Sequence, residues 1–261
     1  SNLGSVLQAG GKLAEAEEAY RQALALATGN LAITGNLGVV LDHQGKREAA
    51  EECYRVVLES DPANPAILGN LAALLSDSGR NDEAQATLAG VLEIEPENAK
   101  GHARMARLQL ADGDAEAALA SARRALALDP NLAEAHFEAG NAHGRLKEPE
   151  QAIAAYLQAV ELNPEFIEAH FNLGNLLRDE IRGQEAVEAY LKVLAIRPDE
   201  IGALGNLGVI YRYLDRLSEA AELNRRILAL DARNYRALVN LGLVLVESGD
   251  ADGALECYDR A

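Results

Sequence analysis

Three histidines stand at a constant interval and are the first residues at which to look for metal chemistry. His102, His136 and His170 are each 34 residues apart. If this interval is that of a stacked structural unit, neighbouring histidines lie about 10 Å apart, the distance between packed helices. Zinc requires its nitrogen ligands within about 2.1 Å of the metal. We therefore expect these side chains to pack against the protein, and we predict no metal site and no cofactor.

No arrangement of side chains typical of catalysis is found. Gly10, Gly11 and Lys12 match only a fragment of a phosphate-binding loop, whose full motif has a longer spacing. Cys53 and Cys257 are too few for a four-cysteine zinc site. The acidic residues are interspersed with lysines and arginines, which is typical of a solvated surface. We expect no catalytic residues and predict that the chain is not an enzyme.

A basic cluster interrupts an otherwise acidic sequence. The 24 Lys and Arg residues stand against 41 Asp and Glu, a formal net charge of −17, so nucleic acid and anionic membrane surfaces are not expected as partners. Lys100, Arg104 and Arg107 are spaced to share one helical face. Together with Asn70 they predict a cationic pocket that contacts an acidic or carboxylate-bearing peptide. The alternative is a salt-bridged wall, for instance with Glu138.

The elements that position these residues follow from an internal repeat. Prolines, alanines and a mixed glycine and alanine series each recur every 34 residues. The three series are Pro62, Pro96, Pro130, Pro164 and Pro198; Ala16, Ala50, Ala84, Ala118, Ala152, Ala186, Ala220 and Ala254; and Gly4, Gly38, Ala72, Ala106, Gly140, Gly174, Gly208 and Gly242. Three series on one period identify a repeat protein.

Each repeat is expected to contain two amphipathic helices. In residues 167–200, apolar spacing predicts a first helix near Ile167–Glu180 and a second near Gln184–Ile196. In five repeats the turn between the helices carries glycine, the residue that a left-handed helix cap favours. Three repeats have Lys147, Ile181 and Asp215 at this point. We expect those three turns to be slightly strained or different.

The 34-residue unit resembles the tetratricopeptide repeat (TPR). Its clearest copy is AHFNLGNLLRDEIRGQEAVEAYLKVLAIRP, residues 169–198, which matches the family at Leu173, Gly174, Ala186, Tyr190 and Pro198. The resemblance implies an all-α, right-handed superhelical solenoid of about eight helix–turn–helix repeats. The whole chain, 1–261, is expected to be one array and a fragment of a longer protein. The repeats lie near 1–30, 31–64, 65–98, 99–132, 133–166, 167–200, 201–234 and 235–261.

The resemblance also implies that the first helix of each repeat lines a concave groove that holds the ligand. Asparagine occupies the sixth position of six of the eight repeats. Its amide can pair with both the C=O and the N–H of an extended peptide, although it could equally cap or bridge neighbouring helices. The predicted peptide-binding residues are Asn36, Asn70, Lys100, Arg104, Arg107, Asn141, Asn172, Asn175, Asn206, Arg236 and Asn240.

Part of this set is similar to the carboxylate clamp of the chaperone-binding members of the family. Asn70, Lys100 and Arg104 match three clamp positions, whereas the two positions expected as lysine and asparagine are Gly35 and Val39. An ordinary chaperone-tail clamp is therefore not expected. The expectation is a contact with an acidic peptide at the three matching residues and Arg107.

Three functions are expected from these observations. The first is a protein–protein interaction scaffold that binds an extended peptide or protein segment along the groove. The second follows from a resemblance to the TPR arm of the O-linked N-acetylglucosamine transferases, which have a similar asparagine series; it implies a substrate-recognition arm without its catalytic domain. The third is a structural array that self-associates head to tail through uncapped ends. A cytoplasmic localisation is expected.

Overall fold

The chain consists of helices throughout the part that the structure, a computed structural model, describes, which is residues 2–261. It forms two compact parts, one ending at Glu138 and one spanning Ala139–Ala261. The N-terminal part contains α1 (Asn2–Ala9), α2 (Leu13–Leu26), α3 (Leu31–His43), α4 (Arg47–Ser60), α5 (Pro65–Asp77), α6 (Asn81–Ile94), α7 (Ala99–Ala111) and α8 (Ala115–Leu128). The boundary falls within α9 (Ala133–Arg145). The C-terminal part continues with α10 (Pro149–Leu162), α11 (Ile167–Asp179), α12 (Gly183–Ile196), α13 (Ile201–Tyr213), α14 (Leu217–Leu230), α15 (Tyr235–Glu247) and α16 (Ala251–Arg260).

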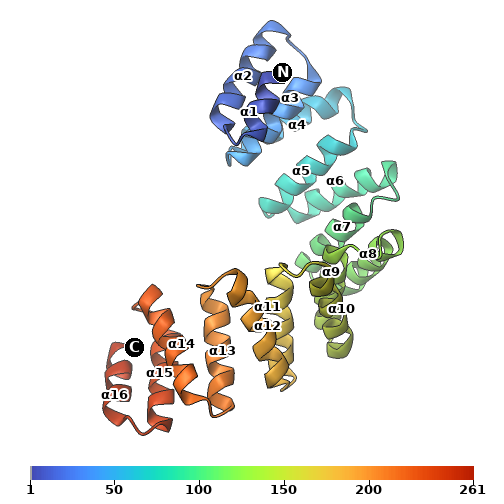
Figure 1. The fold of residues 1–261 in the computed structure, drawn as a ribbon. Helices are drawn as coiled ribbons and strands as arrows, with labels where there is room; N and C mark the ends of the chain where they lie inside the picture. Colours follow the sequence, from blue (N-terminus) through green and yellow to red (C-terminus); the bar gives the residue numbers. More distant parts are fainter. Residues whose placement is uncertain (1) are drawn as a thin grey trace. The chain divides into compact units, whose positions relative to one another are not determined.

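Consecutive helices pack in pairs, which confirms the predicted all-α repeat fold. From α1 to α8 and from α10 to α16, each helix packs against the next one along the chain; Figure 1 shows two such pairs, α5 with α6 and α11 with α12. Helices α11 and α12 begin and end within one residue of the predicted bounds. First helices of neighbouring repeats also contact each other, as α3 does α5, and α13 does both α11 and α15. In these stretches of each part, neighbouring first helices therefore lie side by side.

The turns between paired helices agree with the sequence pattern. Glycine has a positive φ, between 72° and 87°, in the five turns at Gly11, Gly45, Gly79, Gly113 and Gly249. Lys147, Ile181 and Asp215 take the same conformation, with φ of 61°, 61° and 58°. For a residue with a Cβ, this backbone conformation is less favourable by about 1–2 kcal/mol. The prediction that these three turns are strained is confirmed.

Asparagine begins several of the first helices. Its side-chain Oδ1 accepts a hydrogen bond from the backbone N–H three residues further on, which satisfies one of the donors that a helix leaves free at its start. The four bonds are from Ile33 to Asn30 (3.2 Å), from Ile67 to Asn64 (3.1 Å), from Gly101 to Asn98 (2.8 Å) and from Ala237 to Asn234 (3.1 Å). These caps keep the first helices in a constant register along the chain.

Within a repeat, the two helices cross where a glycine meets a tyrosine ring. A Cβ added to Gly38 would lie 2.7 Å from a ring carbon of Tyr54, closer than packed atoms allow, and Tyr54 is itself buried. The glycine thus lets the ring lie directly on the helix backbone. Five repeats share this contact, at Gly4–Tyr20, Gly38–Tyr54, Gly140–Tyr156, Gly174–Tyr190 and Gly242–Tyr258.

The remaining repeats replace the ring by a smaller side chain. Ala72 and Ala106 stand at the glycine position, and Leu88 and Ala122 stand at the tyrosine position of the same repeats. In the seventh repeat the ring is replaced by Asn224, which is 1% exposed; its Nδ2 donates to the carbonyl of Ala220 at 2.8 Å. A methyl group on the first helix therefore occurs only where the tyrosine is absent.

The glycine and tyrosine of a repeat should be thermodynamically coupled. We expect Gly38→Ala to lower the free energy of unfolding by about 1–3 kcal/mol, because the methyl group overpacks against the Tyr54 ring. In a Tyr54→Leu background, which copies the natural Ala72–Leu88 pair, the same change should cost less. A double-mutant cycle from urea unfolding measures the difference.

Gly69→Ala is the matched control, because a Cβ at Gly69 meets no atom within 4 Å. This change should raise stability by about 0.5–1 kcal/mol through helix propensity alone. Equal costs of Gly38→Ala in the two backgrounds would contradict the proposed coupling.

Candidate functional site

All eleven predicted peptide-binding residues lie on first helices. They are Asn36 on α3, Asn70 on α5, Lys100, Arg104 and Arg107 on α7, Asn141 on α9, Asn172 and Asn175 on α11, Asn206 on α13, and Arg236 and Asn240 on α15. The structure gathers some of them into two groups, one in each part of the chain. Whether they contact a peptide stays a prediction.

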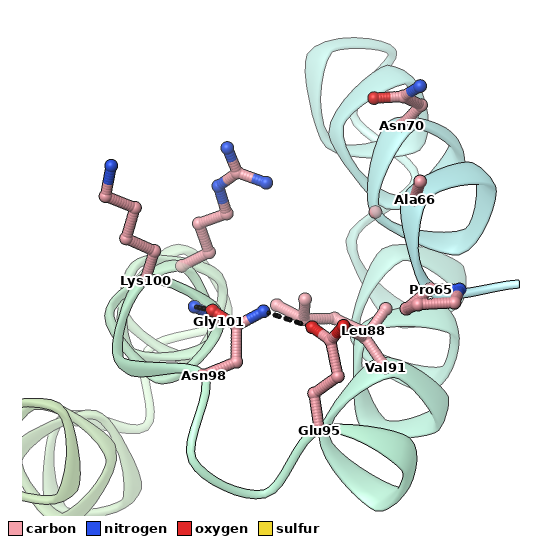
Figure 2. Close-up of a pocket in the computed structure, with 11 residues that line it drawn as sticks. Pro65, Ala66, Asn70, Leu88, Val91, Glu95, Asn98, Lys100 and Gly101 are labelled. Atoms are coloured by element: carbon pink, nitrogen blue, oxygen red, sulfur yellow. Dashed lines mark hydrogen bonds between the residues drawn. The ribbon is translucent and has the colours of Figure 1, made fainter. Parts of the chain in front are cut away.

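The first group surrounds a pocket between α5, α6 and α7. Asn70, Lys100 and Arg104 line it, and its volume is about 360 Å³. In Figure 2, Lys100 projects from α7 and Asn70 from α5, on opposite sides of the pocket. Leu88 and Val91 of α6 add apolar surface between them. The pocket therefore combines two cations, an amide and an apolar floor.

The pocket opens where the chain departs from its own repeat pattern. Leu88 stands at the position that holds tyrosine in five repeats, and a leucine there is both smaller and without a hydroxyl. Gly69 and Gly101 also line the pocket, and neither has a side chain that would fill it. A Cβ on Gly69 would enter open space. Small residues on two helices and a shortened residue on a third together leave the space free.

The cations of this pocket are available to a ligand. Lys100 and Arg104 are exposed and have no ion pair within residues 2–261, and the same is true of Arg107. The alternative of a salt-bridged wall at these residues is therefore wrong. The acidic residue that lines the pocket, Glu95, accepts a hydrogen bond from Asn98 Nδ2 at 2.8 Å (Figure 2).

Two predicted residues of the N-terminal part lie outside this pocket. Arg107 lines, together with Arg104 and Leu88, a narrower cavity of about 10 Å³ deeper between α5 and α7. Asn36 is exposed on α3 and has no side-chain hydrogen bond there. Sequence spacing placed Arg107 on the correct helix, whereas its side chain faces a different hollow.

The second group is a hydrogen-bonded network in the C-terminal part. Asn141 Oδ1 accepts from the Tyr156 hydroxyl at 2.8 Å and from Asn172 Nδ2 at 3.1 Å. One repeat further on, Asn175 Oδ1 accepts from the Tyr190 hydroxyl at 2.7 Å and from Asn206 Nδ2 at 2.9 Å. At these repeats the asparagines bridge neighbouring first helices, which is one of the two roles expected for them.

Arg236 and Asn240 on α15 do not join this network. Arg236 is exposed and Asn240 half-buried, and neither has a side-chain hydrogen bond in the part of the chain that the structure describes. The residue that would anchor Asn240, by analogy with the earlier repeats, is Val209. An apolar residue there cannot accept a hydrogen bond.

The three spaced histidines hold loops in place. The Nε2 atoms of His102, His136 and His170 lie 3.1, 2.9 and 3.0 Å from the carbonyl oxygens of Pro96, Pro130 and Pro164, respectively. Each histidine thus fastens its helix to the loop that precedes it. The expected packing role is confirmed.

No cluster of three metal-ligating side chains occurs among residues 2–261. In the same range, no helix combines the length and the apolar character that crossing a bilayer would require.

Models of known protein families match most of the chain. Models described as tetratricopeptide repeat match residues 1–63, 53–108, 167–200 and 206–261, and one described as TPR repeat matches 148–178. Together these ranges leave out only residues 109–147 and 201–205. No curated protein matches the sequence.

Solved structures support the fold. A crystal structure of MamA is 25% identical with a TM-score of 0.56, and the match covers 65% of this chain and 92% of MamA. A TPR protein from Parabacteroides merdae is 17% identical with a TM-score of 0.71, covering 94% and 96%. YrrB, described as a TPR protein with an unusual peptide-binding site, is 23% identical with a TM-score of 0.57, covering 72% and 97%. The resemblance to the O-linked N-acetylglucosamine transferases is not tested by these comparisons and stays a prediction.

Sequence reasoning missed the tyrosine hydroxyls. Tyr190 was expected only as a packing residue, and Tyr156 was not considered as part of a site. A signal existed, because asparagine 15 residues before the repeat tyrosine occurs only at Asn141 and Asn175. Leu88, which forms the floor of the cationic pocket, was not singled out in the sequence either.

The buried histidine predicts a pH effect on stability. Burial holds the pKa of His170 below its ordinary value of 6.5; Lys192 acts in the same direction, and the hydrogen bond to Pro164 opposes both. The unfolded chain therefore binds this proton more readily than the folded one. Its contribution to stability is complete above pH 6.5 and is lost as the pH falls through the folded-state pKa.

When the pH is lowered from about 7.5 to about 5, we expect the His170→Gln variant to lose less free energy of unfolding than the unmodified chain. Urea unfolding at each pH measures this difference. Glutamine can still donate to the Pro164 carbonyl but does not titrate. His102→Gln, at the same position of another repeat, is the control. An unchanged pH dependence in His170→Gln would contradict the assignment.

Proposed function

Because this chain belongs to the tetratricopeptide repeat family, we propose that it is a protein–protein interaction scaffold whose first helices bind an extended peptide or protein segment. One observation carries this proposal: Lys100 and Arg104 form no ion pair with any of residues 2–261 and line one pocket together with Asn70. We propose that the pocket takes an acidic side chain or a terminal carboxylate of the ligand. The peptide-binding site described for YrrB supports this role.

Charge supports this choice of ligand. The repeat at residues 99–132 has five basic and four acidic residues, whereas the repeat before it, 65–98, has one basic and six acidic. A carboxylate would therefore meet a local cationic site in a chain of net charge −17, and misplaced acidic ligands would be repelled elsewhere. The apolar floor at Leu88 and Val91 suits the methylene groups next to such a carboxylate.

The proposal includes no chemistry by the chain itself. Binding without catalysis, with a protein or peptide and not a nucleic acid or a membrane as partner, is the role that the charge distribution and the pocket favour. A cytoplasmic location goes with this proposal. Recognition of substrates for a glycosyltransferase-like catalytic domain is the alternative use of the same surface.

Head-to-tail self-association, the third function expected from the sequence, stays a prediction.

Light scattering over a concentration series tests self-association. If copies of the chain pair, the mass should rise with concentration. A mass that stays that of one chain at all concentrations would remove this function.

Arg104 should be required for peptide binding. Peptides selected by display against the whole chain should be enriched in acidic residues or in C-terminal carboxylates. For such a peptide, Arg104→Ala should raise Kd about 10- to 100-fold, the effect of one hydrogen bond to a charged group. Fluorescence anisotropy with a labelled peptide measures it, and the effect should shrink as salt is added.

Arg123→Ala is the matched control, because Arg123 is exposed on the neighbouring helix α8 and lies outside the pocket. It removes the same charge from the same repeat. The proposal fails if Arg104→Ala binds as tightly as the unmodified chain, or if both substitutions weaken binding equally.

A further inference from the structure

The amide network of the C-terminal part closes into a ring at Tyr190. Asn206 Nδ2 donates both to Asn175 Oδ1 at 2.9 Å and to the Tyr190 hydroxyl oxygen at 3.1 Å. The hydroxyl donates in turn to Asn175 Oδ1 at 2.7 Å. Each of these three hydrogen bonds thus has a defined donor and acceptor, because the hydroxyl has one proton and an amide oxygen can only accept.

This ring determines which way two amides face. Asn175 Oδ1 is occupied by two donors, so its Nδ2 group is left without a partner in the part of the chain that the structure describes. Asn206 uses Nδ2 in the ring and leaves its Oδ1 without one. Both side chains are half-buried on first helices. The face therefore offers an N–H donor from one repeat and a C=O acceptor from the next.

The tyrosine itself is held rigidly. Its ring lies on Gly174 and is met edge-on by Phe171, with ring centroids 5.9 Å apart at 75°. Phe171 in turn lies against Gly202 of the next repeat. Burial raises the pKa of Tyr190 to about 12, so the hydroxyl keeps the proton that it donates at any physiological pH.

Other sixth-position asparagines have no such anchor. The residues that would correspond to Asn175 are Ser5 for Asn36, Val39 for Asn70 and Val209 for Asn240. None of these three asparagines has a side-chain hydrogen bond among residues 2–261. An unanchored amide can rotate and pays the entropy of ordering when it binds. Of the sixth-position asparagines, those with hydrogen-bonded amides, Asn172 and Asn206, lie in the C-terminal part.

We propose that Tyr190 is a positioning residue: through its hydroxyl it orients Asn175 and Asn206 so that they bind the backbone C=O and N–H groups of an extended, uncharged peptide segment. This inference rests on the proposed function, and it names the ligand chemistry that the first helices of the C-terminal part would recognise. Asn172, anchored on Asn141, continues the pattern one repeat earlier. Repeats about 10 Å apart match roughly three residues of an extended chain.

The test uses the full chain with 15N-labelled asparagine and two capped ten-residue peptides of Ser, Thr and Val. One peptide is unmodified, and the other is N-methylated at alternate residues, so that it lacks half of its backbone donors. The side-chain amide signals of Asn175 and Asn206 should shift with the first peptide and much less with the second. Tyr190→Phe keeps the ring on Gly174 and should raise Kd for the unmodified peptide about fivefold or more.

Tyr54→Phe is the matched control. Tyr54 occupies the same position of the second repeat, and its hydroxyl has no side-chain partner in the part described. It should leave peptide binding unchanged. Urea unfolding confirms that both variants are folded, and Asn206→Ala, which removes the acceptor but not the tyrosine, should weaken binding as Tyr190→Phe does.

Two results would overturn the inference: no binding of the uncharged peptide to the unmodified chain, or equal Kd values for Tyr190→Phe and the unmodified chain. Neither result affects binding of acidic peptides at Arg104, which tests the proposed function separately. Equal binding of the N-methylated peptide would also overturn it, because the backbone would then not be what is recognised.

Discussion

The contact of a tyrosine ring with a glycine backbone is the constraint on which the rest of this structure depends. It determines how closely the two helices of a repeat approach, because a Cβ added at Gly38 or Gly174 would lie only 2.7 or 3.0 Å from a ring carbon. Since the ring packs against the first helix, the hydroxyl of Tyr156 or Tyr190 reaches an asparagine of that helix. The core contact and the order of the polar face thus involve the same side chain, the first through its ring and the second through its hydroxyl.

Variation at this one position accounts for both candidate sites. Where it is Tyr190, a hydroxyl reaches the first-helix face and orders two asparagine amides. Where it is Leu88, the hydroxyl is absent and the shorter side chain becomes the floor of a pocket lined by Lys100 and Arg104. One part of the chain therefore offers directed, uncharged hydrogen-bonding groups, and the other offers charge around a hollow.

Much of this arrangement could be predicted from the sequence, because a repeat of constant length makes each observation count several times. The bounds of α11 and α12, the strain in the turns at Lys147 and Ile181, and the gathering of Asn70 with Lys100 were predicted from the repeat and its spacing. What could not be predicted depends on side-chain direction between repeats. Spacing puts Arg107 on the same helical face as Arg104, and the two line one small cavity, but Arg104 also lines the larger pocket and Arg107 does not. Spacing likewise predicts the same role for every sixth-position asparagine. The structure orders Asn172 and Asn206, which bond to Asn141 and Asn175 of the repeat before.

The two kinds of contact differ in how they survive duplication of a repeat. Gly174 and Tyr190 lie in one repeat, so a copied or deleted repeat carries its whole crossing with it and packs at once. The bond from Asn206 to Asn175 joins two repeats, so after a duplication it forms only where the repeat before the new junction has asparagine at the position of Asn175. A copy of residues 167–200, which holds both Asn172 and Asn175, would form the bond again, whereas a copy of residues 31–64, with Val39 at that position, would not. The array can change length readily, whereas the order of its surface depends on which repeat is copied.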